Sequence, residues 1–187
     1  PSLGASGETN VDLKILPKGS GEIVIGTGSA DATLTSNGSH NLILDTNSGT
    51  NSSNITIVDG ANGDIEFTNN GTGNVKFNDA AYFPEATLTD ASTISWDTQA
   101  APVAKVTLTD NRTLGAGSNA VAGQFVSLLV IQDGTGSRTL SFNAVYEFTE
   151  DTAPTLTTTA SKGDLFVFRY NGSKFLEVGR NLNLTLS

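Results

Sequence analysis

The 187-residue sequence contains no cysteine and no methionine, and it has a single histidine, His40. Without cysteine, the fold depends on neither disulfides nor thiolate metal sites. One histidine alone cannot complete a zinc site, so we expect His40, in the turn SNGSH, to be an exposed or subunit-facing polar residue. The sequence indicates no cofactor.

Basic residues are also few: 10 Lys and Arg stand against 19 Asp and Glu, which gives a net charge of −9. Nucleic acids and anionic lipid surfaces attract clustered Lys and Arg, so we expect neither as a partner. The most apolar run, FVSLLVI, is far too short to span a membrane, and no signal peptide is recognisable. Membrane insertion is therefore not expected.

Helical periodicity is missing as well, because no window of about a dozen residues places apolar side chains at helical spacing. Hydrophobic residues make up only 37% of the chain, whereas there are 20 glycines and many Thr, Asn and Ser. This composition suits short strands joined by tight turns. The sequence predicts an all-β protein.

Between Val11 and Asn78 a short pattern recurs: an apolar residue, a polar one, another apolar one, and then turn-forming residues. Alternation bounded by turn formers is typical of a β-strand, and its recurrence about every ten residues indicates a repeat array. The second apolar residues of the successive pieces are Ile15, Ile25, Leu34, Leu44, Ile57, Phe67 and Phe77.

Such a repeat cannot easily stabilise itself. Each strand offers two apolar side chains, worth roughly 1.5–3 kcal/mol apiece when fully buried, whereas ordering each residue's backbone costs about 1–2 kcal/mol. Three identical chains that turn these side chains toward a shared axis would bury them and pair the strand edges. We therefore expect residues 11–83 to form a trimeric β-stalk, either a β-prism or a triple-stranded β-helix, with the seven residues above as its trimer core.

After Pro84 the strands lengthen and the apolar residues become larger. In residues 124–132 (QFVSLLVIQ) both alternating sets are apolar, which is typical of a central strand covered on both faces. Asp133-Gly134 and Asn171-Gly172 each lie between strand patterns and predict hairpins. Eight or nine short strands with frequent turns predict that residues 84–187 form an antiparallel, jelly-roll-like β-sandwich knob. Residues 1–10 are expected to be a turn-rich lead-in that serves for attachment.

Two sets of motifs resemble those of a known class of proteins. The segments NVDLKILPKGSGEIVI (10–25) and NLILDTNSGTNSSNITIVDGANGDI (41–65) resemble repeats in structural proteins of tailed bacteriophages, especially marine and cyanobacterial ones. TLTDNRTL (107–114), QDGTGSRTLSF (132–142), APTLT (153–157) and DLFVFRYNG (164–172) resemble the C-terminal β-domain of phage tail-fibre and particle-surface proteins. The resemblance implies a homotrimeric projection on a virion, with no catalytic constellation to carry over.

The sequence departs from a tail fibre in one respect, because no sizeable anchoring region precedes the repeats. Either the chain is a fragment of a longer protein, or it attaches through its first residues, as a capsid decoration protein would.

Several polar and aromatic groups suggest chemistry but have simpler explanations. Asp59, Asn62 and Asp64 lie in a Gly-rich loop that superficially suits calcium, yet tight turns need the same residues. The carboxylates Glu147, Glu150 and Asp151 are the best candidates for an acid/base pair for glycoside cleavage, and a solvated loop is the simpler interpretation. The aromatic residues that could include a sugar-stacking platform, and for which a core position is favoured, are Trp96, Tyr146, Phe148, Phe166, Phe168, Tyr170 and Phe175.

The sequence as a whole predicts a non-enzymatic virion protein: a homotrimeric, tail-fibre-type surface projection that contacts the host cell. Its expected partners are its own copies, other virion proteins and a host surface glycan or protein, with Tyr170 and Asn171 as the candidate receptor contact. The alternatives are a capsid decoration or cement protein (or head fibre) and, third, a tailspike-like glycan-cleaving enzyme.

Overall fold

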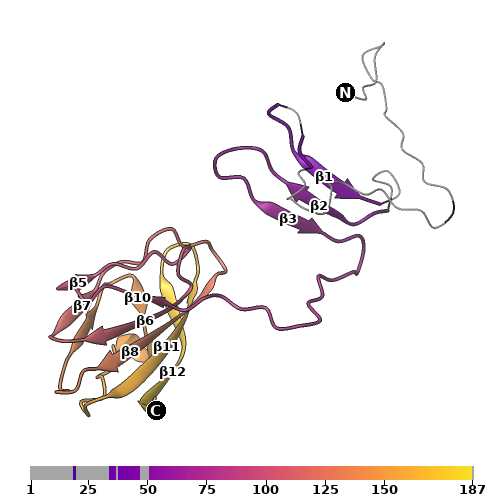
Figure 1. Cartoon of the computed structure of the whole chain (residues 1–187). Coiled ribbons are helices and arrows are strands. Elements are labelled where there is room, and N and C mark those ends of the chain that lie inside the picture. The colour runs from indigo at the N-terminus through magenta and orange to yellow at the C-terminus, as the bar shows by residue number, and fades with distance from the viewer. Residues whose placement is uncertain (1–18, 20–33, 37, 47–50, 187) are drawn as a thin grey trace, which may run out of the picture. The chain divides into compact units, whose positions relative to one another are not determined.

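The computed structural model describes residues 19, 34–36, 38–46 and 51–186. The chain divides into two compact units, residues 1–78 and 79–187. We keep the names stalk and knob for these two units. The knob begins at Asp79, five residues before the boundary predicted at Pro84. The described parts of both are built from β-strands (Figure 1), and the chain is an all-β protein.

The described part of the stalk contains one antiparallel three-stranded sheet. Its strands follow the chain order β1 (Leu42–Asp45), β2 (Asn54–Ile57) and β3 (Ile65–Thr68). Strands β2 and β3 carry the predicted alternation of apolar and polar residues, whereas β1 has three apolar residues in succession, Leu42, Ile43 and Leu44. The β2–β3 turn is closed by hydrogen bonds from the Val58 amide to the Asp64 carbonyl oxygen and from the Gly63 amide to the Gly60 carbonyl oxygen.

The knob contains two sheets. The six-stranded sheet has the order β10-β12-β11-β8-β6-β4, and the three-stranded sheet has the order β5-β7-β9. The strands are β4 (Ala86–Thr87), β5 (Thr93–Ile94), β6 (Val103–Leu108), β7 (Arg112–Leu114), β8 (Phe125–Gln132), β9 (Leu140–Phe142), β10 (Tyr146–Glu147), β11 (Lys162–Tyr170) and β12 (Phe175–Thr185), and η2 (Thr149–Asp151) is a single 3₁₀ turn.

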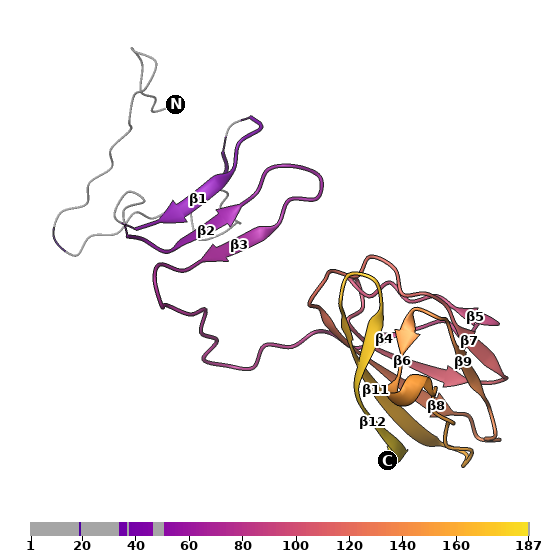
Figure 2. The ribbon, with the colours of Figure 1, turned by 180° about the vertical axis from the view of Figure 1, so that it is seen from behind.

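The predicted antiparallel, jelly-roll-like arrangement is wrong for the first part of the knob. From β4 to β9 the chain alternates between the two sheets, so β4, β6 and β8 pair in parallel in one sheet and β5, β7 and β9 pair in parallel in the other. Figure 2 shows β9 beside β7 in the smaller sheet. The chain therefore winds through three coils, because parallel neighbours require a crossover and here the crossover is a strand of the opposite sheet.

The two predicted hairpin turns have different outcomes. Asn171-Gly172 joins β11 and β12, which pair antiparallel as expected. Asp133-Gly134 instead begins the corner that takes the chain from β8 to β9 in the other sheet. The sequence pattern also predicts a strand at residues 155–158, and the structure has no strand there. The Asp133 carboxylate accepts hydrogen bonds from the amides of Thr135 and Gly136, which turns the chain away from the direction of a hairpin.

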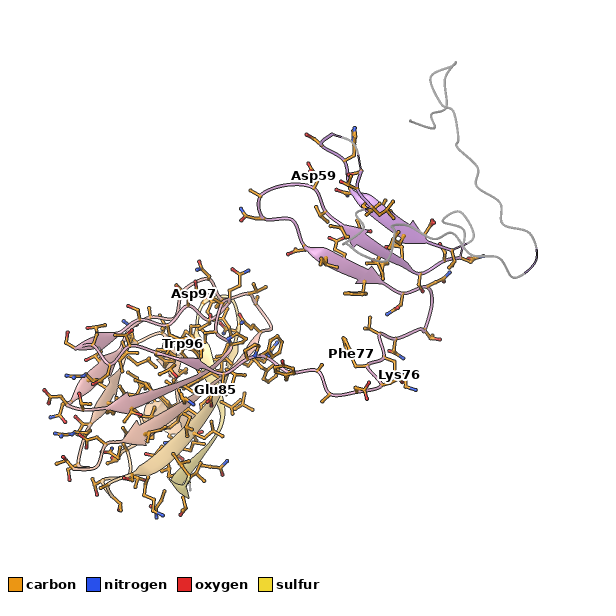
Figure 3. The ribbon with its side chains drawn as sticks, in the orientation of Figure 1. Asp59, Lys76, Phe77, Glu85, Trp96 and Asp97 are labelled. Carbon is orange, nitrogen blue, oxygen red and sulfur yellow. The ribbon has the colours of Figure 1, made fainter. Side chains whose placement is uncertain are left out.

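One apolar core joins the two sheets of the knob. The smaller sheet contributes Ile94, Leu114 and Leu140, and alternate residues of β6, β8 and β11 face them. Trp96 lies in this core (Figure 3), stacks near Phe175 with 6.5 Å between ring centroids, and donates a 2.8 Å hydrogen bond to the Ala101 carbonyl oxygen. The aromatic residues expected in the core are buried, apart from the half-buried Tyr170.

Strand β8 is central, as expected, since it pairs with β6 and β11. The expectation that both of its faces are covered is wrong among the described residues. Val126, Leu128 and Val130 face the core, whereas Phe125, at the start of the other set, is 58% exposed.

Candidate functional site

The stalk sheet carries one continuous apolar face. In the strand register, Leu44 lies opposite Ile55, which lies opposite Phe67, and the next row contains Leu42, Ile57 and Ile65. Directly opposed residues of antiparallel strands project to the same side of a sheet, so all six side chains share one side. We call these six residues, Leu42, Leu44, Ile55, Ile57, Ile65 and Phe67, the stalk face.

The stalk face is largely open to solvent in the single chain. The exposed fraction is 47% for Leu44, 44% for Ile57 and 55% for Phe67, and it reaches 62% for Ile65. Monomeric proteins rarely expose a contiguous apolar patch of this kind, and such patches commonly mark interaction sites. The other side of the sheet is mainly polar, although it includes the exposed Ile43.

The seven predicted trimer-core residues have three different placements. Leu44, Ile57 and Phe67 lie together on the stalk face. Leu34 and Phe77 lie outside the strands, 57% and 68% exposed, with Phe77 in the coil that follows β3 (Figure 3). Ile15 and Ile25 lie outside the described residues.

Leu42, Ile55 and Ile65 belong to the stalk face but were not among the predicted trimer-core residues. Each is the first apolar residue of its strand pattern. The period of two along a strand was the available signal, because it places residues i and i+2 on one face.

The predicted receptor-contact pair lies at the β11–β12 hairpin. Asn171 is exposed, but its side-chain oxygen accepts hydrogen bonds from the amides of Ser173 (2.9 Å) and Lys174 (2.8 Å). Tyr170 is half-buried and packs on Phe175, with 4.7 Å between ring centroids. Both side chains therefore stabilise the hairpin, and a ligand would meet the remaining exposed surface of the turn.

The three candidate acid/base carboxylates lie close to one another at the surface. Glu147 forms an ion pair with Lys174, which lowers the pKa of Glu147, and a hydrogen bond with Glu147 raises the pKa of Asp151. Glu150 is exposed in the adjoining 3₁₀ turn, and both Glu150 and Asp151 have positive φ angles. Glu147 is thus engaged with Lys174.

The metal candidates lie in turns of the stalk. The Asp59 amide donates a 2.9 Å hydrogen bond to the Asn41 side chain, and Asn62 and Asp64 lie in the β2–β3 connection. Within the described part of the chain, no group of three or more His, Asp or Glu side chains is placed to hold a metal ion. His40 is exposed, and its carbonyl oxygen accepts a hydrogen bond from the Ser36 hydroxyl.

The corners of the knob contain ion pairs that were not predicted from the sequence. Both nitrogens Nε and Nη2 of Arg112 donate to the Asp90 carboxylate, at 2.8 and 3.0 Å, and this contact lowers the pKa of Asp90 to about 2. Arg138 binds Asp133 in the third coil, with 2.8 Å between Nη2 and Oδ2, and lowers the pKa of Asp133. The Asp90 ion pair joins the first coil to the second, whereas the Asp133 ion pair lies within the corner of the third, so both carboxylates are engaged in the fold.

An internal repeat was the signal for these corners. ATLTDASTI (86–94) and VTLTDNRTL (106–114) align without a gap and share Thr-Leu-Thr-Asp and a later Thr, and each has its aspartate at the point where the chain leaves the larger sheet. A hairpin interpretation treats each copy separately, whereas a repeat at a fixed step indicates a wound chain.

The chain matches no protein-family model, and no match is found among curated proteins. In the described part of the chain, no helix has the length and apolar character needed to cross a bilayer.

Proposed function

We propose that the chain is a non-enzymatic structural protein of a tailed-phage particle, in which three copies assemble through the stalk face into an acidic β-stalk that presents three β-sandwich-like knobs. One observation carries the proposal: the stalk face is continuous and apolar, and nothing in its own described unit covers it. The resemblance of the repeats and of the knob motifs to phage fibre and particle-surface proteins supports the class.

Assembly around an axis also suits the charge of the chain. Glu66 and Asp45 project from the side of the sheet opposite the stalk face, together with Asn54 and Thr68. Closing the apolar sides toward one another would leave these polar groups in solvent and an acidic outer surface. Apolar side chains stabilise a sheet only where they are removed from water, so a core shared between copies would supply the burial that the stalk face lacks.

Three knobs on one stalk would bind a repeated host glycan or surface protein with avidity, even where each single contact is weak. The exposed part of the 170–174 turn is the contact that we propose first, since Asn171 and Lys174 are exposed there.

Sedimentation equilibrium of the whole chain tests the assembly. The expected mass is three times the 19.3 kDa of one chain, at all micromolar concentrations. A single-chain mass would overturn the proposal, and a two-chain mass would overturn the three-fold arrangement.

Imaging of particles with a labelled antibody against the knob tests the location. Label at the tail is the expected result. Label at capsid lattice positions would replace the host-contact role with a decoration or cement role.

A further inference from the structure

The larger sheet of the knob has an outer side that is also apolar. Its burial alternates along β6, β8 and β11, with one set of side chains in the core and the other directed outward. Register places the outward residues in cross-strand rows: Val103, Ser127 and Val167 form one row, and Lys105, Leu129 and Leu165 form the next. We call the apolar members of this side, together with Phe83, the knob face: Phe83, Val103, Phe125, Leu129, Ile131, Leu165 and Val167.

Aromatic side chains at one end of the knob face are strongly exposed. Phe83 is 68% exposed and Phe125 is 58% exposed. Both side chains line a shallow hollow of about 230 Å³, which Val103 and Val167 also line. A Phe side chain buries about 150–250 Å², so covering these two rings alone would remove roughly 250 Å² of apolar surface per copy.

The charge of the knob face differs from that of the chain as a whole. The outward side chains of β6, β8 and β11 include no carboxylate, although the chain has 19 acidic residues. The charged groups there are Lys105, which forms a 2.6 Å ion pair with Glu85, and Arg169 at the edge. Loss of charge from the centre of a surface, with aromatic residues retained, is typical of protein interfaces.

We infer that the knob face is a second self-association surface, covered by the knob of a sister copy of this chain. The inference rests on the proposed trimer. Phe83 belongs to the segment through which the chain passes from the stalk into the knob, so copies joined by their stalks hold their knob faces at high effective concentration. An interface smaller than the about 800 Å² per partner of a freely formed complex is then sufficient.

A thiol-labelling experiment tests the inference, since the natural chain has no cysteine to interfere. Ser127→Cys places one thiol in the knob face, and Thr113→Cys places a control thiol on the exposed side of β7 in the smaller sheet. Each is made in the natural chain and in a chain that also carries Leu44→Asp and Ile57→Asp, which break the stalk face. The reaction rate with a maleimide dye and the mass by light scattering are measured on all four proteins.

The expected result is that the Ser127→Cys thiol reacts at least ten times more slowly in the assembled chain than in the stalk-broken chain, whereas the Thr113→Cys thiol reacts at one rate in both. Comparing each thiol with itself cancels its intrinsic reactivity. A three-chain mass for the natural chain, a single-chain mass for the stalk-broken chain and equal Ser127→Cys rates in the two would overturn the knob face and leave the trimer standing.

Two further outcomes separate the two surfaces. A natural chain that is monomeric would overturn both the proposed trimer and the knob face. A stalk-broken chain that keeps three copies and a slow Ser127→Cys thiol would support the knob face and would show that the stalk face does not hold the copies together.

Discussion

Replacing Leu44, the β1 member of a stalk-face row, by Asp should separate the copies. Leu44 opposes Ile55 in the register and is 47% exposed in the single chain, so about half of its apolar surface remains available to a partner. A fully buried Leu is worth about 1.5–3 kcal/mol, and the unburied half therefore accounts for roughly 1 kcal/mol per chain, or about 3 kcal/mol per trimer.

The new carboxylate adds a larger penalty. An unpaired charge taken out of water costs several kcal/mol even after relaxation, and three copies would bring three such charges together. The sum is on the order of 10 kcal/mol per trimer, and each 1.4 kcal/mol is a factor of ten in the association constant. A trimer that is complete at micromolar concentration would become monomeric.

Ile43→Asp is the matched control, because Ile43 is the neighbouring residue of β1, is 56% exposed, and projects from the opposite side of the sheet. We expect sedimentation velocity to give the natural mass for Ile43→Asp and a single-chain mass for Leu44→Asp. Equal masses for the two variants, whether trimeric or monomeric, would refute the argument that one face of this sheet forms the trimer core.

Three further predictions concern the knob, whose unfolding can be followed by the fluorescence of Trp96, the single and buried tryptophan. The pKa of Asp90 is about 2, against an ordinary 3.8, and this difference stabilises the knob above pH 4 by about 1–2 kcal/mol. This stability is lost as the pH falls from about 4 to 2. Urea titrations at a series of pH values should show that Asp90→Asn removes that part of the pH dependence. Phe168→Ala should lower the free energy of unfolding by about 3–5 kcal/mol in urea, because the side chain is fully buried. Gly136→Ala should lower the thermal midpoint, because φ is +76° and a Cβ atom would lie 2.5 Å from a backbone oxygen, whereas Gly134→Ala, which meets nothing within 4 Å, should change it little.

Local alternation in the sequence was enough to predict the strands of the stalk. In β1 to β3 an apolar residue recurs at every second position, and the structure places these residues on one side of a sheet; Ile43 of β1 is the additional apolar residue on the other side. Pairing partners could not be predicted, because register depends on turn geometry and the β1–β2 connection differs in length from the β2–β3 connection. Because the paired strands run antiparallel, Leu44 lies opposite Ile55, and not opposite the repeat-equivalent Ile57.

The winding of the knob illustrates a different limit. The dipeptide Asp133-Gly134 favours a two-residue hairpin, yet the corner here is longer, and Arg138 reaches back to bind Asp133. The buried Gln132 adds two bonds to the backbone of Arg138, one donated at 2.9 Å and one accepted at 2.8 Å. These side-chain contacts across the corner thus outweigh the hairpin preference of the Asp-Gly dipeptide, and a two-residue pattern does not contain them.

Carboxylates are abundant in this chain, and their positions explain why its apolar faces can serve as interfaces. Asp90 and Asp133 are bound by arginines at corners of the knob, and Asp164 is buried, where it accepts hydrogen bonds from the amides of Thr157 and Asn183. Other acidic groups remain in solvent and repel copies that approach in the wrong orientation. Because the stalk face and the knob face contain no carboxylate, the proposed contacts between copies through these faces would avoid burying like charges, so the charge distribution would also select the orientation in which the copies assemble.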